Sequence, residues 1–191
     1  MFKNINKSAG QASRLLLVLA VVVLVAVIIV YLVMKMADRP VEPPTLNPGG
    51  VELPVYEKTL GNIRFVFASA IDRGSVLRAT SPTQKDLVAT AGGKFIQVTI
   101  GAQNVGTENT EQNVWDINNI VDSNGRNFIP VTGDVVRSWL PSSSFCGALL
   151  KPAFDPLPCT KIYEVSKIST GLKIGVESGK NRTGLLDLIV K

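Results

Sequence analysis

Two cysteines, Cys146 and Cys159, carry the most distinctive chemistry in this chain of 191 residues. They lie in a loop-like stretch, SSSFCGALLKPAFDPLPC, and their even count favours a disulfide in an oxidising compartment. A bridge that closes a loop of about 14 residues would stabilise the fold by roughly 3 kcal/mol. The pair lacks the C-x-x-C spacing usual for redox enzymes. We therefore predict a structural disulfide, with two free thiols as the alternative.

No other residues form a recognisable catalytic or metal-binding group. The chain has no histidine, which removes His-based triads and most zinc hydrolase sites. Residues 142–144 are three serines without a G-x-S-x-G elbow, and they read as a polar loop. The carboxylates are scattered without pairing: Asp116, Asp134, Asp155 and Asp187. We predict no catalytic, cofactor-binding or metal-binding residue, and keep an envelope enzyme that uses carboxylates or the cysteines as a third hypothesis.

Residues 122–125, Asp-Ser-Asn-Gly, have the opening of a calcium-binding loop. The regular oxygen ligands that should follow, and the Glu at the twelfth position, are missing. A hairpin turn built on Asn124 and Gly125 explains the same residues. We predict the turn.

The segment from Arg137 to Cys159 holds large apolar side chains among its prolines. On a disulfide-tied loop they could form a partner-binding surface, for which the candidate residues are Trp139, Phe145, Leu149 and Phe154. Alternatively, they could cap one end of the folded domain. The sequence alone does not show exposure, so both interpretations stay open.

The candidate residues described above all lie in the part of the chain that follows a long apolar run. Residues 15–34 contain no charge, Pro or Gly, and a helix of about 20 residues spans the hydrocarbon core of a bilayer. The run is long for a cleaved signal peptide, and no small-x-small site follows it. We predict an uncleaved transmembrane helix, with cleavage as the alternative.

The charges that flank this run favour a cytoplasmic N-terminus. Residues 1–14 form a basic tail with Lys3, Lys7 and Arg14 and no acid, whereas Lys35 and Arg39 follow the run together with acidic residues. The domain would then be extracytoplasmic, on the outer side of a cell membrane. Residues 1–39 carry five of the 20 Lys and Arg and one of the 15 Asp and Glu. The rest of the chain is nearly neutral, so the pI near 9.3 does not indicate nucleic-acid binding.

Residues 35–60 contain five prolines and a Gly-Gly pair, which predicts a semi-rigid linker. From residue 61 to 191 the pattern changes to short runs with a period of two, separated by Asn, Gly, Pro and Ser clusters. These runs predict the strands of an antiparallel, immunoglobulin-like β-sandwich. The predicted strands are residues 62–70, 94–105, 114–121, 127–131, 161–165, 171–177 and 185–190. We expect no long helix here, although residues 81–87 could form one turn.

Several short motifs resemble a bacterial extracytoplasmic family of unknown function. They are GKFIQV at residues 93–98, QNVG at 103–106, IVDSNG at 120–125, LKP at 150–152 and IYEV at 162–165. The resemblance implies a telokin-like, immunoglobulin-like sandwich behind a membrane anchor, covers roughly residues 61–191, and brings no catalytic residues. The chain departs from the family where Ala153 replaces an expected Gly and Ser166 an expected Pro.

The anchor, the linker and the sandwich together predict a membrane-anchored, non-enzymatic interaction or adhesion module of the cell envelope. We expect its partner to be an envelope protein or glycan, or a second copy in a homo-oligomer. The alternative is a pilin-like filament subunit, because residues 10–13, Gly-Gln-Ala-Ser, resemble a prepilin cleavage site before an apolar helix. Leu15 stands where pilins have an acidic residue. A mature chain that starts at Gln11 would support that alternative.

Overall fold

Apolar residues at every second position favour the two longest strands, β2 (Ile63–Gly74) and β5 (Gly93–Asn104). They pair antiparallel, from Ile63 opposite Asn104 to Gly74 opposite Phe95. Every second residue of β5 from Ile96 to Ala102 points inward and is fully buried. Because side chains alternate between the faces of a strand, one face of this pair forms core and the other faces outward.

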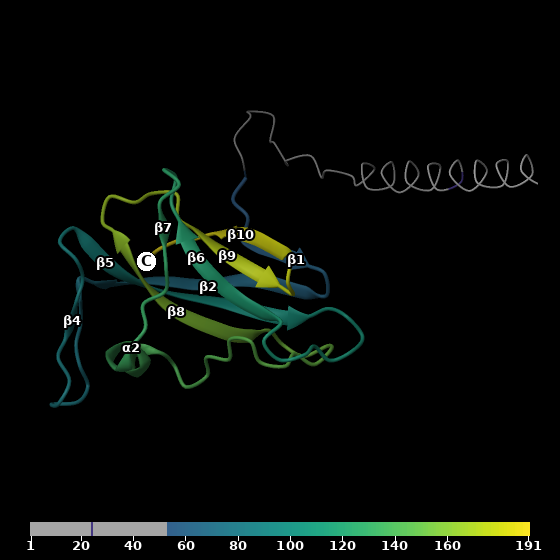
Figure 1. Ribbon diagram of the computed structural model, residues 1–191, viewed down its shortest axis with the longest axis horizontal. Coiled ribbons are helices and arrows are strands. Elements are labelled where there is room, and N and C mark those ends of the chain that lie inside the picture. Colours follow the sequence, from purple (N-terminus) through teal and green to yellow (C-terminus); the bar gives the residue numbers. More distant parts are fainter. Residues whose placement is uncertain (1–23, 25–52) are drawn as a thin grey trace, which may run out of the picture. The chain divides into compact units, whose positions relative to one another are not determined.

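The computed structural model describes Leu24 and residues 53–191, and residues 53–191 form a unit of their own (Figure 1). One four-stranded sheet has the order β1-β2-β5-β8, with β1 at Glu57–Leu60 and β8 at Leu157–Ser166. The other has the order β10-β9-β6-β7. Its strands are β6 (Trp115–Val121), β7 (Asn127–Phe128), β9 (Lys173–Ser178) and β10 (Arg182–Asp187).

The inner faces of the two sheets share one core. Its largest fully buried side chains include Trp115, Phe65 and Tyr163, and the rings of Phe65 and Trp115 meet edge to face at 6.3 Å. Two antiparallel sheets around a common apolar core form a β-sandwich. The predicted sandwich is confirmed at this level.

A second apolar cluster covers the outer face of the first sheet. It joins Phe95 and Ile162 to Leu77 and Val136, all buried. Leu77 comes from a two-stranded hairpin of β3 (Val76–Leu77) and β4 (Leu87–Val88), and Val136 comes from a short helix, α2 (Asp134–Trp139). The helix ends at Trp139, and its C-cap residue Leu140 has an extended backbone before Pro141.

The observed elements differ from the predicted ones in several places. The hairpin of β3 and β4 was not predicted, β2 extends past residue 70 to Gly74, and β10 starts at Arg182, three residues before the predicted residue 185. Strand β1 lies within the segment assigned to the linker, β8 starts four residues before the predicted residue 161, and α2 was not predicted. Within residues 81–87, a single turn at residues 81–84 is closed by the Gln84 N–H on the Ser81 carbonyl at 3.1 Å, and β4 begins at Leu87.

None of the helices in the described part of the chain is long and apolar enough to cross a membrane. The basic tail (1–14), the predicted span (15–34) except Leu24, and linker residues 35–52 lie outside the described residues. The predicted uncleaved anchor therefore stays a prediction, and the pilin-like alternative with processing after Gly10 stays open.

Candidate interaction surface

A disulfide joins Cys146 to Cys159 with the two Cα atoms 4.5 Å apart, which confirms the predicted bridge. Cys159 lies in β8 and is fully buried, while Cys146 is half-buried in the loop between α2 and β8. The Phe145 N–H donates to the Pro158 carbonyl at 2.8 Å beside the bridge. The start of the loop is thus fixed to the edge strand of the first sheet.

Polar side chains of β8 reach across to the second sheet next to the disulfide. Lys161 Nζ lies 2.7 Å from both Asp116 Oδ2 and the Ile117 carbonyl, and the Tyr163 hydroxyl donates to the Asn118 carbonyl at 2.6 Å. Burial, with a smaller contribution from the Asp116 charge, raises the pKa of Tyr163 well above its usual value, so this hydroxyl stays protonated. Side-chain hydrogen bonds therefore connect the two sheets along this side.

Asp116 Oδ1 lies 3.7 Å from the sulfur of Cys159. Asp116 and the two cysteines are the one group of potential metal ligands within the described residues. Both sulfurs are committed to the disulfide, so they do not offer thiolates to a metal ion.

Residues 122–126 form the predicted hairpin turn between β6 and β7. The Gly125 N–H donates to the Asp122 carbonyl at 2.9 Å, and Gly125 has a φ of 74°, which glycine adopts without strain. Asp122 Oδ1 accepts from the N–H groups of Asn124 and Arg126 at 3.0 Å, and Oδ2 accepts from Arg126 Nε at 2.6 Å. Burial opposes ionisation, but these bonds outweigh it and lower the pKa of Asp122. Both carboxylate oxygens of Asp122 therefore stabilise the turn.

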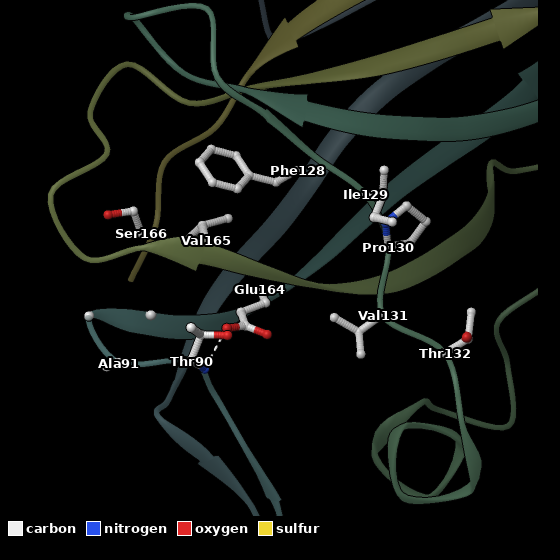
Figure 2. Close-up of a pocket in the computed structure, with 12 residues that line it drawn as sticks. Thr90, Ala91, Phe128, Ile129, Pro130, Val131, Thr132, Glu164, Val165 and Ser166 are labelled. Atoms are coloured by element: carbon white, nitrogen blue, oxygen red, sulfur yellow. Dashed lines mark hydrogen bonds between the residues drawn. The ribbon is translucent and has the colours of Figure 1, made fainter.

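One concavity, of about 640 Å³, lies where residues 128–132 diverge from the end of β8 (Figure 2). Phe128 and Val165 lie on one side, and Glu164 lies on the other beside Thr90. Glu164 Oε1 accepts a 2.6 Å hydrogen bond from the Thr90 N–H. An added Cβ at Gly93 would lie 2.9 Å from the same oxygen. This carboxylate therefore holds the turn before β5 in place.

A second concavity of about 600 Å³ lies across residues 130–132, between α2 and the disulfide. Its apolar wall, Val136 and Ile162, belongs to the second core cluster. Two of its polar groups are engaged internally, with Lys161 bound to Asp116 and Ser144 Oγ bound to both the N–H and the carbonyl of Thr160. In both of these concavities, some of the lining groups have structural roles.

A third, smaller cavity of about 240 Å³ has two large apolar side chains exposed at its mouth, whereas the first concavity has one, Ile129, which is 70% exposed. Phe154 is 62% exposed and Leu149 is 37% exposed. Its floor is apolar core: Ala102 and Leu150 are buried, and Leu157 packs against the same cluster. We call the exposed residues around this cavity, Leu149, Lys151, Phe154 and Asp155, the loop surface.

Hydrogen bonds fix the loop that carries this surface. The indole N–H of Trp115 donates to the Ala148 carbonyl at 2.7 Å, and Asn104 Nδ2 donates to the Leu150 carbonyl at 3.1 Å. Gln103 Nε2 donates to the carbonyl of Phe154 itself at 2.9 Å. The exposed side chains therefore project from an ordered backbone.

Ala153, directly before Phe154, has a φ of 62°. This left-handed conformation costs a residue with a Cβ roughly 1–2 kcal/mol. It is the position where the resemblance leads one to expect Gly. Backbone strain of this kind concentrates at functional sites, which marks this part of the loop.

The four candidate partner residues are divided by the structure. Leu149 and Phe154 line the third cavity together, and Phe145, which is 45% exposed, lies beside the disulfide. Trp139 instead packs against the second core cluster, donates from Nε1 to the Arg78 carbonyl at 3.0 Å, and lies under the Arg73 guanidinium. Leu150, in the same loop, is buried and caps the core.

Sequence reasoning missed the charged residues of the loop surface, Lys151 and Asp155. Both are exposed and line the cavity, and Lys151 Nζ lies 5.7 Å from the centroid of the Phe154 ring. The segment Lys-Pro-Ala-Phe-Asp-Pro at residues 151–156 held a signal, because it places an aromatic residue between opposite charges and two prolines.

No protein-family model matches the chain, and no curated protein matches it in sequence. Among solved structures it is similar to a conserved hypothetical protein from Bacillus anthracis, with 15% identity, 70% of this chain and 94% of that chain covered, and a TM-score of 0.44. A functionally unknown protein from Listeria monocytogenes has 10% identity, 71% and 82% coverage and a TM-score of 0.44. An uncharacterised β-sandwich protein from Clostridium difficile has 7% identity, 72% and 92% coverage and a TM-score of 0.36.

These likenesses concern the fold of bacterial proteins and do not bear on function. The class of this chain follows from its own features: an antiparallel β-sandwich whose end carries a disulfide-tied loop with exposed apolar side chains.

Proposed function

We propose that the chain is a membrane-tethered, non-enzymatic interaction or adhesion module of a bacterial cell envelope, with the sandwich on the extracytoplasmic side. The observation that carries the proposal is the exposure of Phe154 and Leu149 around an apolar cavity on an ordered loop. Exposed aromatic anchors next to a cavity are typical of protein interfaces. The motifs quoted above support membership of the telokin-like, immunoglobulin-like family.

Two further features support the location. The apolar run at residues 15–34 is long enough to anchor the chain, and the Cys146–Cys159 disulfide suits an oxidising compartment. The domain is nearly neutral, so we expect its partner to be recognised through apolar contact more than through net charge.

Affinity capture from detergent-solubilised membranes tests this function. The bait is the full chain with a C-terminal tag, compared with Phe154→Ser and with Ile168→Ser as the matched control. Ile168 is a still more exposed apolar residue, at 76%, and lies outside the loop surface. We expect the wild type and Ile168→Ser to recover the same specific envelope component, and Phe154→Ser to lose it. Recovery of the same components by all three baits, or of none by the wild type, would overturn the proposal.

A further inference from the structure

The cavity of the loop surface has the size of a side-chain socket. Its volume of about 240 Å³ lies below the roughly 300–1,000 Å³ typical of small-molecule sites. Its floor is apolar, with Ala102 and Leu150 buried beneath the mouth. A single large apolar side chain from another molecule fits this description better than a free ligand does.

A side chain of that kind stands at the edge of the same cavity. Phe154 lines the cavity and is 62% exposed, so the chain presents a protruding aromatic ring and an apolar socket side by side. A two-fold symmetric contact brings one patch of the surface against the same patch of a second copy, and such a patch must be complementary to itself. A ring next to a socket meets that requirement.

The charges at the mouth are self-complementary as well. Lys151 and Asp155, one of each sign, are exposed on either side of Phe154 in the sequence. In a two-fold symmetric pair, Lys151 of each copy can face Asp155 of the other copy, which gives two ion pairs. Charges arranged in this way select the partner and fix the register of a contact more than they add affinity.

From these observations we infer that the loop surface is a homodimer contact, in which each copy places Phe154 in the cavity of the other and Lys151 pairs with Asp155 across the two-fold axis. The inference rests on the proposed interaction function and names the partner as a second copy of this chain. The ordered loop backbone and the fixed φ of Ala153 reduce the conformational entropy lost on pairing.

The contact surface is small, so the tether is important for the pairing. Two copies held in one membrane meet at a high effective concentration, which allows a contact that is weak in free solution to form. We therefore expect pairing of the full chain in lipid vesicles or detergent micelles at high occupancy, and weaker pairing on dilution.

Charge exchange tests the pairing directly. Two differently tagged copies of the full chain are reconstituted together in vesicles of neutral phospholipid, and capture of one tag is scored for the other. Lys151→Glu makes both charges of the patch acidic, and Asp155→Lys makes both basic, so each variant should lose self-capture by roughly tenfold or more. Mixed with each other, the two variants should recover it, as should the double variant Lys151→Glu/Asp155→Lys.

The controls separate this inference from the proposed function. Phe154→Ser should abolish self-capture and Ile168→Ser should keep it, with circular dichroism showing all variants folded. Failure of the mixed pair to recover, or self-capture by Phe154→Ser, would overturn the homodimer. If the wild type does not self-pair while Phe154→Ser still loses a different envelope component, the homodimer is refuted and the interaction function stands.

Discussion

At the scale of single residues, Ala153 combines a side chain with a left-handed backbone conformation that disfavours a Cβ. Its φ of 62° is one that glycine adopts readily, and it directly precedes Phe154. The only other non-glycine residue with positive φ in the described part of the chain is Asn113, a type that tolerates this region. The strain at Ala153 therefore belongs to the loop surface.

We expect Ala153→Gly to raise the free energy of unfolding by about 1 kcal/mol, because it removes the Cβ from a left-handed residue while adding some freedom to the unfolded chain. Urea denaturation of both proteins measures the difference. The reverse change, Gly125→Ala at φ 74°, should lower stability by roughly 1–2 kcal/mol, since an added Cβ there meets no neighbour and the backbone alone is strained. A destabilising Ala153→Gly would contradict this reading of the loop.

Asp122 makes stability depend on pH. Its folded pKa lies below the ordinary value of 3.8, so its carboxylate contributes stability that is present above that value and is lost as pH falls through the folded pKa. Asp122→Asn should therefore be less stable than the wild type from pH 7 to 5, with the gap shrinking below about pH 4. Denaturation series at each pH measure this gap, and a gap independent of pH would refute the role given to the charge.

At the scale of elements, side-chain hydrogen bonds from β8 to β6 connect the two sheets of the sandwich. Tyr163 is fully buried, and its hydroxyl bonds the Asn118 carbonyl at 2.6 Å. We expect Tyr163→Phe to lower the free energy of unfolding by about 1–2 kcal/mol, because the carbonyl loses a buried donor. The matched control is Tyr56→Phe, at a ring that is 37% exposed, with an expected change within about 0.5 kcal/mol. Equal effects of the two variants would contradict the proposed connection between the sheets.

The disulfide is the second feature that connects structural elements, because it joins the loop before β8 to β8 itself. Replacing both cysteines, as Cys146→Ala/Cys159→Ala, should lower the free energy of unfolding by roughly 2–4 kcal/mol, because the open loop gains freedom in the unfolded chain. The wild type kept in a thiol reductant strong enough to open the bridge should shift to the same midpoint. An unchanged denaturation midpoint in the variant would show that the disulfide does not stabilise the fold.

The elements that sequence patterns predicted are those whose apolar residues recur with a period of two along the strand. Strand β5 shows a sustained period of two and was predicted almost to its ends. Strand β1 was hidden in the linker because three of its four residues are exposed and prolines precede it. The start of β8 contains Pro158, which an edge strand tolerates but which reads as a loop. Helix α2, with six residues, is too short to show a helical period.

The candidate site was predicted only in part, for a related reason. Leu149 and Leu150 are neighbours of the same type, yet one is exposed and the other is buried. The difference follows from long-range hydrogen bonds to Thr110 and Asn104, which no local pattern encodes. The disulfide could be predicted because two cysteines allow a single intramolecular pairing.

At the scale of the whole molecule, a nearly neutral sandwich follows an apolar N-terminal run whose flanks hold most of the net charge. The sandwich is folded around its own core from Leu53 onward, so the proposed division of roles assigns recognition to this domain and anchoring to the run. The central claim is that recognition occurs at the loop surface.

Site-specific photo-cross-linking in intact cells tests that claim most directly. A benzophenone amino acid replaces Phe154 in one full-length variant and Ile168 in another, and irradiated membranes are analysed for covalent adducts. The account predicts a discrete adduct of higher mass from position 154, a second copy of this chain if the homodimer inference holds, and little or none from position 168. No adduct from position 154, or the same adducts from both positions, would contradict it.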